Sequence, residues 1–281
     1  INKDFDEYLD FTVKELPITN HKIITNSTVF KPIIKTLLDE DKISITTSID
    51  AGTTEVFNKI RNFKSLEKVL GNLVKYSKDN NQRNITIKYI IMDENNSLEE
   101  IKSFIDNLKK HNLLKSNIQI SYNFKREDID YKSSLAIIML YCLLKKENAQ
   151  FVFFDDLLRN KFSYIRESFE EIHKVLKKNN LESFIISKES TKKIVIWGAG
   201  FQTQEIVQNT ILLKDVEIAY IVDNTLSKLG TKFLGYKIYD PKVLIDNNLP
   251  ILISAVQSSP LILKKAKELG LKEDRIINKL V

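Results

Sequence analysis

The first part of the chain, up to residue 154, alternates short apolar segments rich in β-branched residues with longer segments of helical period. The apolar segments, which predict strands, are 21–26, 42–49, 84–92, 117–124 and 150–154. The segments between them repeat apolar residues at intervals of three and four, which predicts helices at 30–40, 65–78, 97–111 and 131–146. This alternation predicts parallel β/α units, and the continuous apolar strands predict a sheet covered by helices.

The rest of the chain contains a helical segment and then a second alternation. Residues 155–191 are amphipathic, and they predict either a bridge between domains or a helical cap. From residue 192 the pattern predicts strands at 192–198, 216–223, 250–255 and 274–280, an extended piece at 232–240, and helices at 201–213, 241–246 and 259–270. This is the order of a doubly wound domain of about 90 residues.

Single residues mark where two of these helices begin. Ser97 and Glu100 have the spacing of a capping box, in which each side chain bonds the backbone N–H of the other residue. Pro241 stands at the first position of its predicted helix, where its missing N–H costs no hydrogen bond.

The composition limits the chemistry of this chain. Its single cysteine, Cys142, cannot form an internal disulfide, which fits a reducing, cytoplasmic compartment. One thiol cannot hold an iron–sulfur cluster, and the three histidines stand far apart, so we expect neither a cluster nor a metal site in this chain. The net charge of +6 comes mostly from lysines interleaved with acidic residues, without a basic stripe, so we expect no nucleic-acid partner.

Two further expectations concern membranes and processing. No run of about 18 apolar residues is present, so no membrane span is predicted. The sequence shows no secretory signal and begins with Ile1 rather than Met, so we expect a processed chain or a part of a longer one.

The segment "WGAGFQTQE" places a glycine turn between a predicted strand and a predicted helix. Gly198 permits a tight turn, and Gly200, which follows Ala199, lets the backbone approach a pyrophosphate. The next helix offers free N–H groups and the positive end of its dipole to such an anion. Asp223 ends the following strand, where an acidic side chain can accept hydrogen bonds from ribose hydroxyls.

Other residues leave the occupancy of this turn open. The third glycine position of the dinucleotide pattern holds Thr203, whose branched side chain separates helix from strand, so the turn is alternatively a fold feature without a ligand. No Tyr-x-x-x-Lys pair of the short-chain dehydrogenase kind accompanies it. A polar group after the strand at 250–255 either binds a phosphate or ribose or caps a helix: Ser254, Gln257, Ser258 and Ser259.

Residues 192–281 resemble the small Rossmann-like domain of bacterial surface-polysaccharide enzymes. The resemblance rests on "KKIVIWGAG", "IAYIVDN", "LGTKFLGYKIYDPKVL" and "ILISAVQ", which are similar to the nucleotide-sugar-binding domain of sugar acetyltransferases of the PglD type. It implies a nucleotide or nucleotide-sugar as ligand and a small nucleotide-linked substrate as partner. The binding residues that it implies are Gly198, Ala199, Gly200 and Asp223.

The first half carries a more specific signal, "SITTSIDAGTTEVFNKIR", from Ser44 to Arg61. It resembles the fourth strand and following helix of radical S-adenosylmethionine enzymes. The segments "HKIITNSTVFKPIIKTLLDED", "NITIKYIIMDENNSLEEIKSFID" and "NIQISYNFKRED" resemble the third, fifth and sixth strands of that family. The resemblance covers roughly residues 1–155 and implies part of a (β/α) barrel. The expected fold is therefore α/β, with a partial (β/α) barrel half at 1–154, a helical linker at 155–191 and a small doubly wound Rossmann-like domain at 192–281.

The resemblance also implies roles for residues of the first half. Ser48 and Asp50 would approach the ribose hydroxyls of S-adenosylmethionine, and Arg61 would pair bidentately with its methionine carboxylate. Lys88 and Tyr89 would lie near the adenine or the substrate. The structural alternatives are that Asp50 caps the next helix and that Arg61 is a surface charge at a helix end.

The chain departs from this family in two respects, because it lacks the first two strands of the barrel and the residues that bind the cluster. The cysteine triplet that holds the 4Fe-4S cluster, Cys-x-x-x-Cys-x-x-Cys, is absent. The resemblance therefore implies a cluster and S-adenosylmethionine only in a longer parent enzyme, and no catalytic residue is assigned here.

Three hypotheses about function follow. The first is the C-terminal portion of a radical S-adenosylmethionine enzyme with an appended nucleotide-sugar-binding domain, acting in surface polysaccharide biosynthesis and inactive without the cluster region. The second is a non-catalytic nucleotide-sugar-binding or interaction module. The third is an NAD(P)-dependent oxidoreductase.

Overall fold

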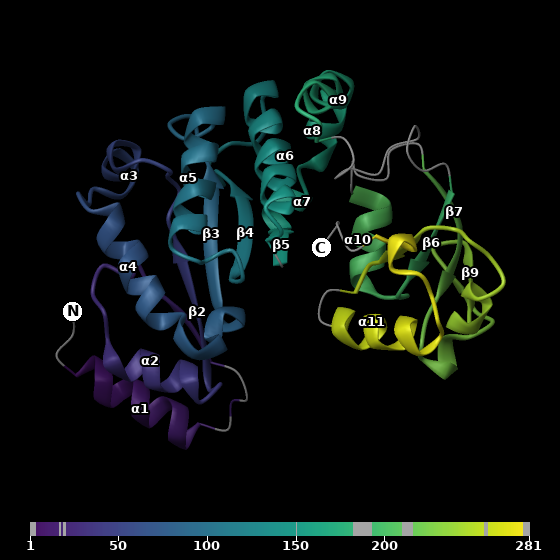
Figure 1. Cartoon of the computed structure of the whole chain (residues 1–281), viewed down its shortest axis with the longest axis horizontal. Helices are drawn as coiled ribbons and strands as arrows, with labels where there is room; N and C mark the ends of the chain where they lie inside the picture. Colours follow the sequence, from purple (N-terminus) through teal and green to yellow (C-terminus); the bar gives the residue numbers. More distant parts are fainter. Residues whose placement is uncertain are drawn as a thin grey trace. The chain divides into compact units, whose positions relative to one another are not determined.

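The chain forms two compact units of the expected α/β class (Figure 1). The computed structural model describes residues 4–16, 18, 21–149, 151–181, 193–209, 216–255 and 258–277. By their contacts, residues 1–127 and 131–155 belong to the first unit, and 128–130 and 156–281 belong to the second. The helices α7 (Asp156–Arg159), α8 (Phe162–Glu167) and α9 (Phe169–Lys178), in the segment predicted as a linker, group with the second unit.

The first unit follows the predicted alternation of strands and helices. Its strands are β1 (His21–Ile24), β2 (Ile43–Ser48), β3 (Ile85–Ile91), β4 (Asn117–Tyr122) and β5 (Phe151–Phe154). Its helices are α1 (Phe5–Glu15), α2 (Pro32–Asp39), α3 (Thr54–Arg61), α4 (Leu66–Tyr76), α5 (Leu98–Lys110) and α6 (Tyr131–Lys146), with a 3₁₀ segment at Lys78–Asn84. The pattern did not predict α1, a helix without a fully buried residue.

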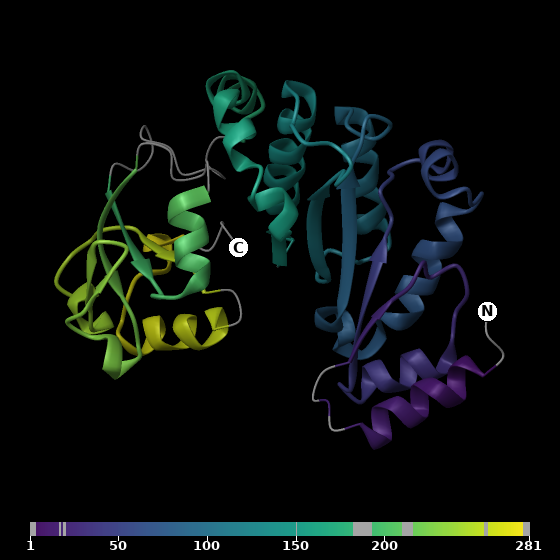
Figure 2. The same ribbon diagram turned by 180° about the vertical axis from the view of Figure 1, so that it is seen from behind.

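The five strands form one parallel sheet in the order of the chain, β1-β2-β3-β4-β5, and Figure 1 shows β2 to β5 in this order; Figure 2 shows the same sheet from behind. Right-handed crossovers between neighbouring parallel strands place the connecting helices on one face of the sheet. The rings of Tyr89 in β3 and Phe104 in α5 lie 4.6 Å apart on that face, and those of Phe154 in β5 and Tyr141 in α6 lie 5.2 Å apart. This sequential order is also the order of strands in a (β/α) barrel.

The opposite face of this sheet carries polar side chains in register. Ser48 of β2 pairs with Lys88 of β3, which pairs with Gln119 of β4. Along β3, fully buried positions alternate with half-buried ones, because strand side chains point to alternate faces. The predicted cover of helices is therefore found on one face only, within the described part of the first unit.

The second unit is a doubly wound sheet with the order β11-β10-β6-β7-β9-β8. Its strands are β6 (Lys193–Trp197), β7 (Glu217–Val222), β8 (Lys232–Phe233), β9 (Tyr236–Tyr239), β10 (Ile251–Ile253) and β11 (Ile276–Ile277), and its crossover helices are α10 (Phe201–Asn209) and α11 (Ser259–Glu268). β6 lies between β7 and β10, and all three run parallel. The strands predicted at 192–198, 216–223 and 250–255 and the helices predicted at 201–213 and 259–270 are found here within the described residues, and the ends predicted at 210–213 and 278–280 lie outside them.

Two local predictions in this unit need correction. The extended piece at 232–240 is a hairpin of antiparallel β8 and β9, because Leu234 and Gly235 turn the chain with φ of 52° and 84°. The helix expected at 241–246 is a single 3₁₀ turn, Pro241–Leu244, which the side chain of Asp240 caps by accepting the N–H of Lys242 at 2.8 Å.

Candidate functional sites

The glycine turn of the second unit follows β6 and requires glycine at one position. Gly198 has φ of 124°, and a Cβ there would lie 2.8 Å from Ser254 Oγ. Its N–H donates to the carbonyl of Val222 at 2.8 Å, which holds the turn against the end of β7. At Gly200, in contrast, an added Cβ would meet nothing within 4 Å, so the chain leaves open space beside this residue.

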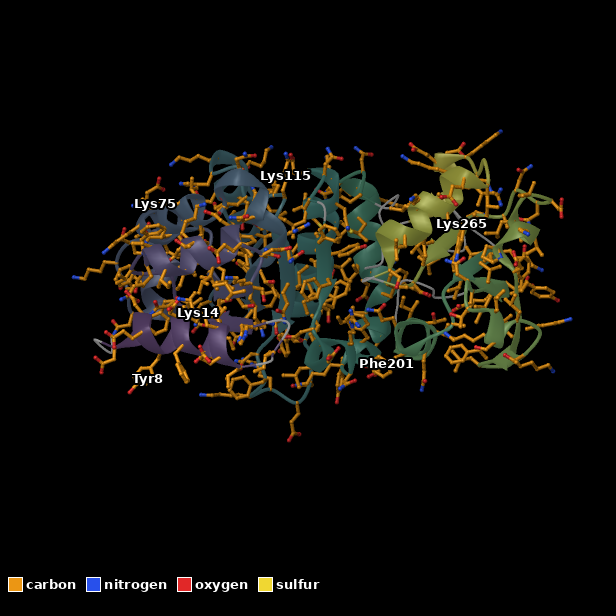
Figure 3. The ribbon with its side chains drawn as sticks, turned by 90° about the horizontal axis from the view of Figure 1, so that it is seen from below. Tyr8, Lys14, Lys75, Lys115, Phe201 and Lys265 are labelled. Carbon is orange, nitrogen blue, oxygen red and sulfur yellow. The ribbon has the colours of Figure 1, made fainter. Side chains whose placement is uncertain are left out.

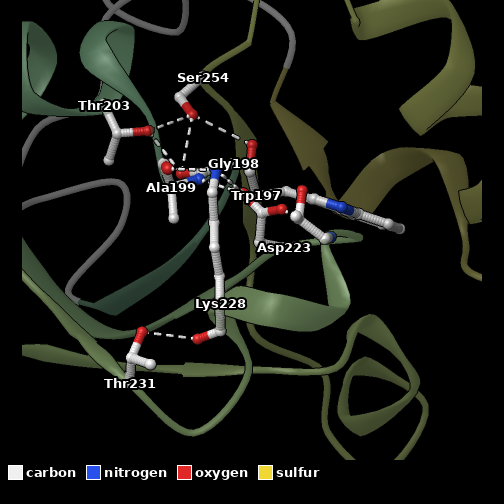
Figure 4. Close-up of polar contacts among 9 residues, drawn as sticks. Trp197, Gly198, Ala199, Thr203, Asp223, Lys228, Thr231 and Ser254 are labelled. Carbon is white, nitrogen blue, oxygen red and sulfur yellow. Dashed lines mark hydrogen bonds and ion pairs between the residues drawn. The ribbon is translucent and has the colours of Figure 1, made fainter.

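Asp223, predicted as a ribose ligand, binds the glycine turn. Its Oδ2 accepts the N–H of Ala199 at 2.7 Å and lies 3.3 Å from Lys228 Nζ, and its Oδ1 accepts the N–H of Thr225 at 2.8 Å (Figure 4). Burial by itself raises the pKa of Asp223, but these N–H groups and the ammonium outweigh it and hold the pKa below its usual value. The ribose role remains a prediction, and the bonds to Ala199 and Thr225 brace the turn.

Thr203, at the third glycine position, is buried and bonded across the glycine turn. Thr203 is 1% exposed, and its hydroxyl donates to the carbonyl of Gly198 at 2.5 Å and lies 2.7 Å from Ser254 Oγ. Ser254 Oγ in turn donates to the carbonyl of Trp197 at 3.1 Å (Figure 4). These contacts connect α10 to the ends of β6 and β10. In the dinucleotide pattern, a glycine at this position lets the helix pack closely against the strand.

Of the two roles predicted for the polar group after β10, helix capping is not found at Ser254 or Ser258, and phosphate or ribose binding stays a prediction. Ser254 does not cap α11, because its hydroxyl is used between the strand ends. Ser258 stands at the N-cap of α11 but makes no side-chain capping bond, and it lines a pocket. Gln257 lies outside the described residues, as does the side chain of Ser259.

A pocket of about 500 Å³ lies over the glycine turn. It opens at the carboxyl ends of the neighbouring strands β6 and β10. The strand order reverses between these two strands, since β7 and β9 lie on one side and β11 on the other. Ligands of open α/β sheets bind at such a switch point. Among its described lining residues, Lys228 is the one cation and Asp223 the one anion. The sequence prediction missed Lys228, which stands in a loop without a motif and reaches the turn only through the fold.

In the first unit, Asp50 and Arg61 are brought together. Asp50 is fully buried with φ of 55°, and its Oδ1 accepts the N–H of Ile90 at 2.6 Å while its Oδ2 forms an ion pair with Arg61. The alternative that Asp50 caps the next helix is wrong, because Thr53 is the N-cap of α3 and accepts the N–H of Val56 with its own side chain. The Arg61 side chain is 33% exposed, so part of the guanidinium still reaches the surface.

Three further side chains hold the loop that carries Asp50, and the sequence did not predict this role for any of them. Glu100 Oε1 accepts the N–H groups of Gly52 at 2.6 Å and Thr53 at 2.8 Å, Asn107 donates to the carbonyl of Gly52 at 2.6 Å, and Asn95 donates to that of Asp50 at 2.8 Å.

The predicted capping box is therefore only half formed. Ser97 accepts the N–H of Glu100 at 3.2 Å, whereas the Glu100 carboxylate reaches across to the loop at Gly52 instead of returning to Ser97. The capping pattern located the start of α5 correctly but gave its glutamate the wrong partner.

A second pocket, also of about 500 Å³, lies beside this loop at the carboxyl ends of β1 and β2. It is lined mainly by polar and aromatic residues, together with one aliphatic residue: Ile24, Thr25, Asn26, Thr28, Ser48, Phe57, Arg61, Asn62 and Phe63. Ser48 and Arg61, two of the residues predicted to contact S-adenosylmethionine, thus share one cavity, while Asp50 lies buried behind Arg61.

The predicted neighbours Lys88 and Tyr89 point to opposite faces of the first sheet. Tyr89 packs against α5 and donates to the carbonyl of Asn95 at 3.0 Å, and burial raises its pKa far above the usual value. Lys88 lies on the polar face, with Nζ 3.2 Å from Asp155 Oδ2, which also accepts from the Ser121 hydroxyl. Of the two, only Lys88 stands where a ligand on the polar face could contact it.

Comparison with known proteins gives one partial match. A family model described as C2185-like, N-terminal, matches residues 190–277, which include the glycine turn, Asp223 and Lys228 but less than half of the chain. No curated protein matches the chain.

Two features are absent from the described residues. No group of three or more histidine, cysteine or acidic side chains there is placed to hold a metal ion. No helix among them is both long and apolar enough to cross a membrane.

Proposed function

We propose that the first unit is the S-adenosylmethionine-binding part of a radical S-adenosylmethionine enzyme. The observation that carries the proposal is the pocket at the ends of β1 and β2, which brings Ser48 and Arg61 together. Those two residues come from the segment of the chain that resembles the nucleoside-binding strand of that family. A pocket with a guanidinium, hydroxyls and two phenylalanine rings suits a ligand that joins a carboxylate, a ribose and a base.

Each part of this pocket has a distinct task in the proposal. Arg61 binds the carboxylate of the ligand, and the Arg61–Asp50 ion pair fixes the guanidinium in the pocket wall. Ser48 bonds a ribose hydroxyl, and the half-buried Phe63, whose ring packs edge-on against that of the buried Phe57 with centroids 6.5 Å apart, offers apolar surface to the adenine. Asp50 acts through Arg61 rather than on the ribose.

The residues of this chain do not fit the iron–sulfur cluster of the same family. Its single cysteine, Cys142, is fully buried in α6, whereas such clusters take several thiolates. We therefore derive no radical step from these residues and propose ligand binding as their activity.

For the second unit we propose binding of a nucleotide or nucleotide-sugar over the glycine turn. The proposal is supported by the pocket at the switch point of the doubly wound sheet and by the open space beside Gly200. An NAD(P)-dependent oxidoreductase is the weaker reading, because Asp223 already accepts two backbone N–H groups and pairs with Lys228.

Isothermal titration of the purified chain with S-adenosylmethionine tests the first proposal. We expect binding that Ser48→Ala weakens about threefold to tenfold, the effect of one hydrogen bond. Ser44→Ala is the matched control, because Ser44 lies on the same face of β2 but outside the pocket. Absence of binding, or equal losses in both variants, would contradict the proposed site.

Titration of the same chain with UDP, UDP-glucose and NADH tests the second proposal. We expect UDP or UDP-glucose to bind and NADH to bind at least tenfold more weakly. A preference for NADH would favour the oxidoreductase reading, and no binding by any of the three would contradict nucleotide binding by the second unit.

A further inference from the structure

Two exposed apolar side chains stand at the mouth of the pocket in the second unit. Phe201, the first residue of α10, is 68% exposed, and Leu261 of α11 is 70% exposed, although both line the pocket. Figure 3 shows the Phe201 side chain at the surface of the molecule. The Phe201 ring contributes little to the stability of the fold, because only about a third of its surface is buried.

Lys228 places a positive charge at the same pocket. Its Nζ donates to the carbonyl of Ala199 at 2.7 Å and lies 3.3 Å from Asp223, and its side chain remains 40% exposed (Figure 4). The side chain runs along the open side of the turn, and Thr231 fixes its backbone by donating to the Lys228 carbonyl at 2.7 Å.

The contacts of this ammonium can be exchanged for those of an anion. A lysine is a flexible point charge with three donors, and a backbone carbonyl is a weaker partner for it than a phosphate oxygen. If Lys228 turns away, Asp223 still accepts its two backbone N–H groups, and these hydrogen bonds continue to stabilise its negative charge. The start of α10, next to the open space at Gly200, supplies further N–H groups to the same anion.

From this geometry we propose that the pocket takes a nucleoside mono- or diphosphate, with its phosphate on Lys228 and its base stacked on Phe201. The inference rests on the proposed nucleotide binding of the second unit and assigns its two recognition residues. Stacking on an aromatic ring tolerates any base, so Phe201 selects for a planar group and Lys228 for a phosphate. A free pyrophosphate then engages Lys228 and the N–H groups at the start of α10 but not the Phe201 ring, and a nucleoside engages only that ring.

A factorial titration separates the two roles. The chain is titrated with inorganic pyrophosphate, with uridine and adenosine, and with UDP and ADP. Lys228→Met should weaken pyrophosphate and the nucleoside diphosphates at least tenfold and leave the nucleosides unchanged. Phe201→Ala should weaken the nucleosides and nucleoside diphosphates about 5- to 100-fold and leave pyrophosphate unchanged.

Control variants test whether the changes in affinity are specific to the pocket. Lys232→Met removes an exposed lysine and Ile245→Ala an exposed apolar residue, both in the same unit but outside the pocket, and neither should change any affinity. Lys228→Arg should retain phosphate binding. The fluorescence of Trp197, the single tryptophan of the chain, checks that each variant keeps the second unit folded, because this side chain is 1% exposed in the core.

The outcomes distinguish this inference from the proposal beneath it. If the unaltered chain binds no nucleotide, the proposed function of the second unit fails and the inference with it. If nucleotides bind but Lys228→Met and Phe201→Ala behave as the controls do, nucleotide binding stands and this assignment is wrong. If pyrophosphate binding depends on Phe201 as strongly as on Lys228, the division of roles is refuted.

Discussion

Replacing Gly52 by alanine tests how the loop of the first pocket is built. A Cβ at this position would lie 2.2 Å from the carbonyl oxygen of Glu100 and 2.4 Å from the backbone nitrogen of Phe104, both in α5. Backbone atoms of a packed helix cannot rotate away as the end of a side chain can. Either the loop or α5 must shift, and a shift separates Gly52 from the Glu100 carboxylate that accepts its N–H.

The expected loss is large for a single methyl group. Overpacking costs about 1–3 kcal/mol, and weakening the bonds from a buried carboxylate to two N–H groups adds about 1.5–3 kcal/mol. We therefore expect Gly52→Ala to lower the free energy of unfolding of the first unit by about 3–5 kcal/mol. This corresponds to a Tm lower by about 10 °C for a unit of this size.

A second glycine serves as the control, and one cysteine and one tryptophan report the unfolding of the two units. Gly71 lies within α4, where an added Cβ meets nothing within 4 Å, so Gly71→Ala should stabilise the unit by about 0.5–1 kcal/mol. Cys142 is the only cysteine and is fully buried in the first unit, so its labelling by a thiol reagent in urea reports unfolding there. Trp197 reports the second unit and should keep its transition in both variants.

The reasoning would be refuted if the free energy of unfolding of Gly52→Ala, measured by Cys142 labelling in urea, stayed within about 0.5 kcal/mol of that of the unaltered chain. It would also be refuted if Gly71→Ala destabilised the unit as much as Gly52→Ala, because the effect would then not depend on the close approach of α5.

Two further predictions concern the glycine turn of the second unit. Because Asp223 has a lowered pKa in the folded chain, its stabilisation is complete above its unfolded pKa, near 3.9, and is lost as the pH falls through the folded value. Asp223→Asn should thus lower stability at pH 7, and the difference should shrink at acid pH in urea titrations followed by Trp197 fluorescence; a constant difference would contradict this. Ser254→Ala and Thr203→Val should each cost about 1 kcal/mol. Their combination should cost less than the sum, because the two hydroxyls lie 2.7 Å apart and the loss of either one changes the surroundings of the other, whereas full additivity would show that they are not coupled.

Most of the secondary structure of both units could be predicted from the sequence, because it depends on local period and on turn residues. The alternation of apolar strands and helical stripes located the described strands that form the two sheets. The hairpin at Leu234 and the short turn at Pro241 could not be predicted this way, because their outcome depends on strand pairing and on the length of chain left before β10.

The candidate sites were predictable only in part. Gly198, Ser48 and Arg61 were found by motif or resemblance, and each lines one of the two pockets. Lys228 and Phe201 carry no motif, and their place at a pocket follows from where the loop after β7 and the start of α10 lie in the fold.

Local patterns were enough to predict the α/β class, the order of most elements and the position of the glycine turn, because these follow from periodicity and from the conformations that only glycine tolerates. The tertiary structure alone decided the partners of the charged residues. Asp50 was expected at a ribose and pairs with Arg61, and Glu100 was expected at Ser97 and holds Gly52. Hydrogen-bond partners of this kind are far apart in the chain, so no local pattern encodes which donor a buried carboxylate will meet.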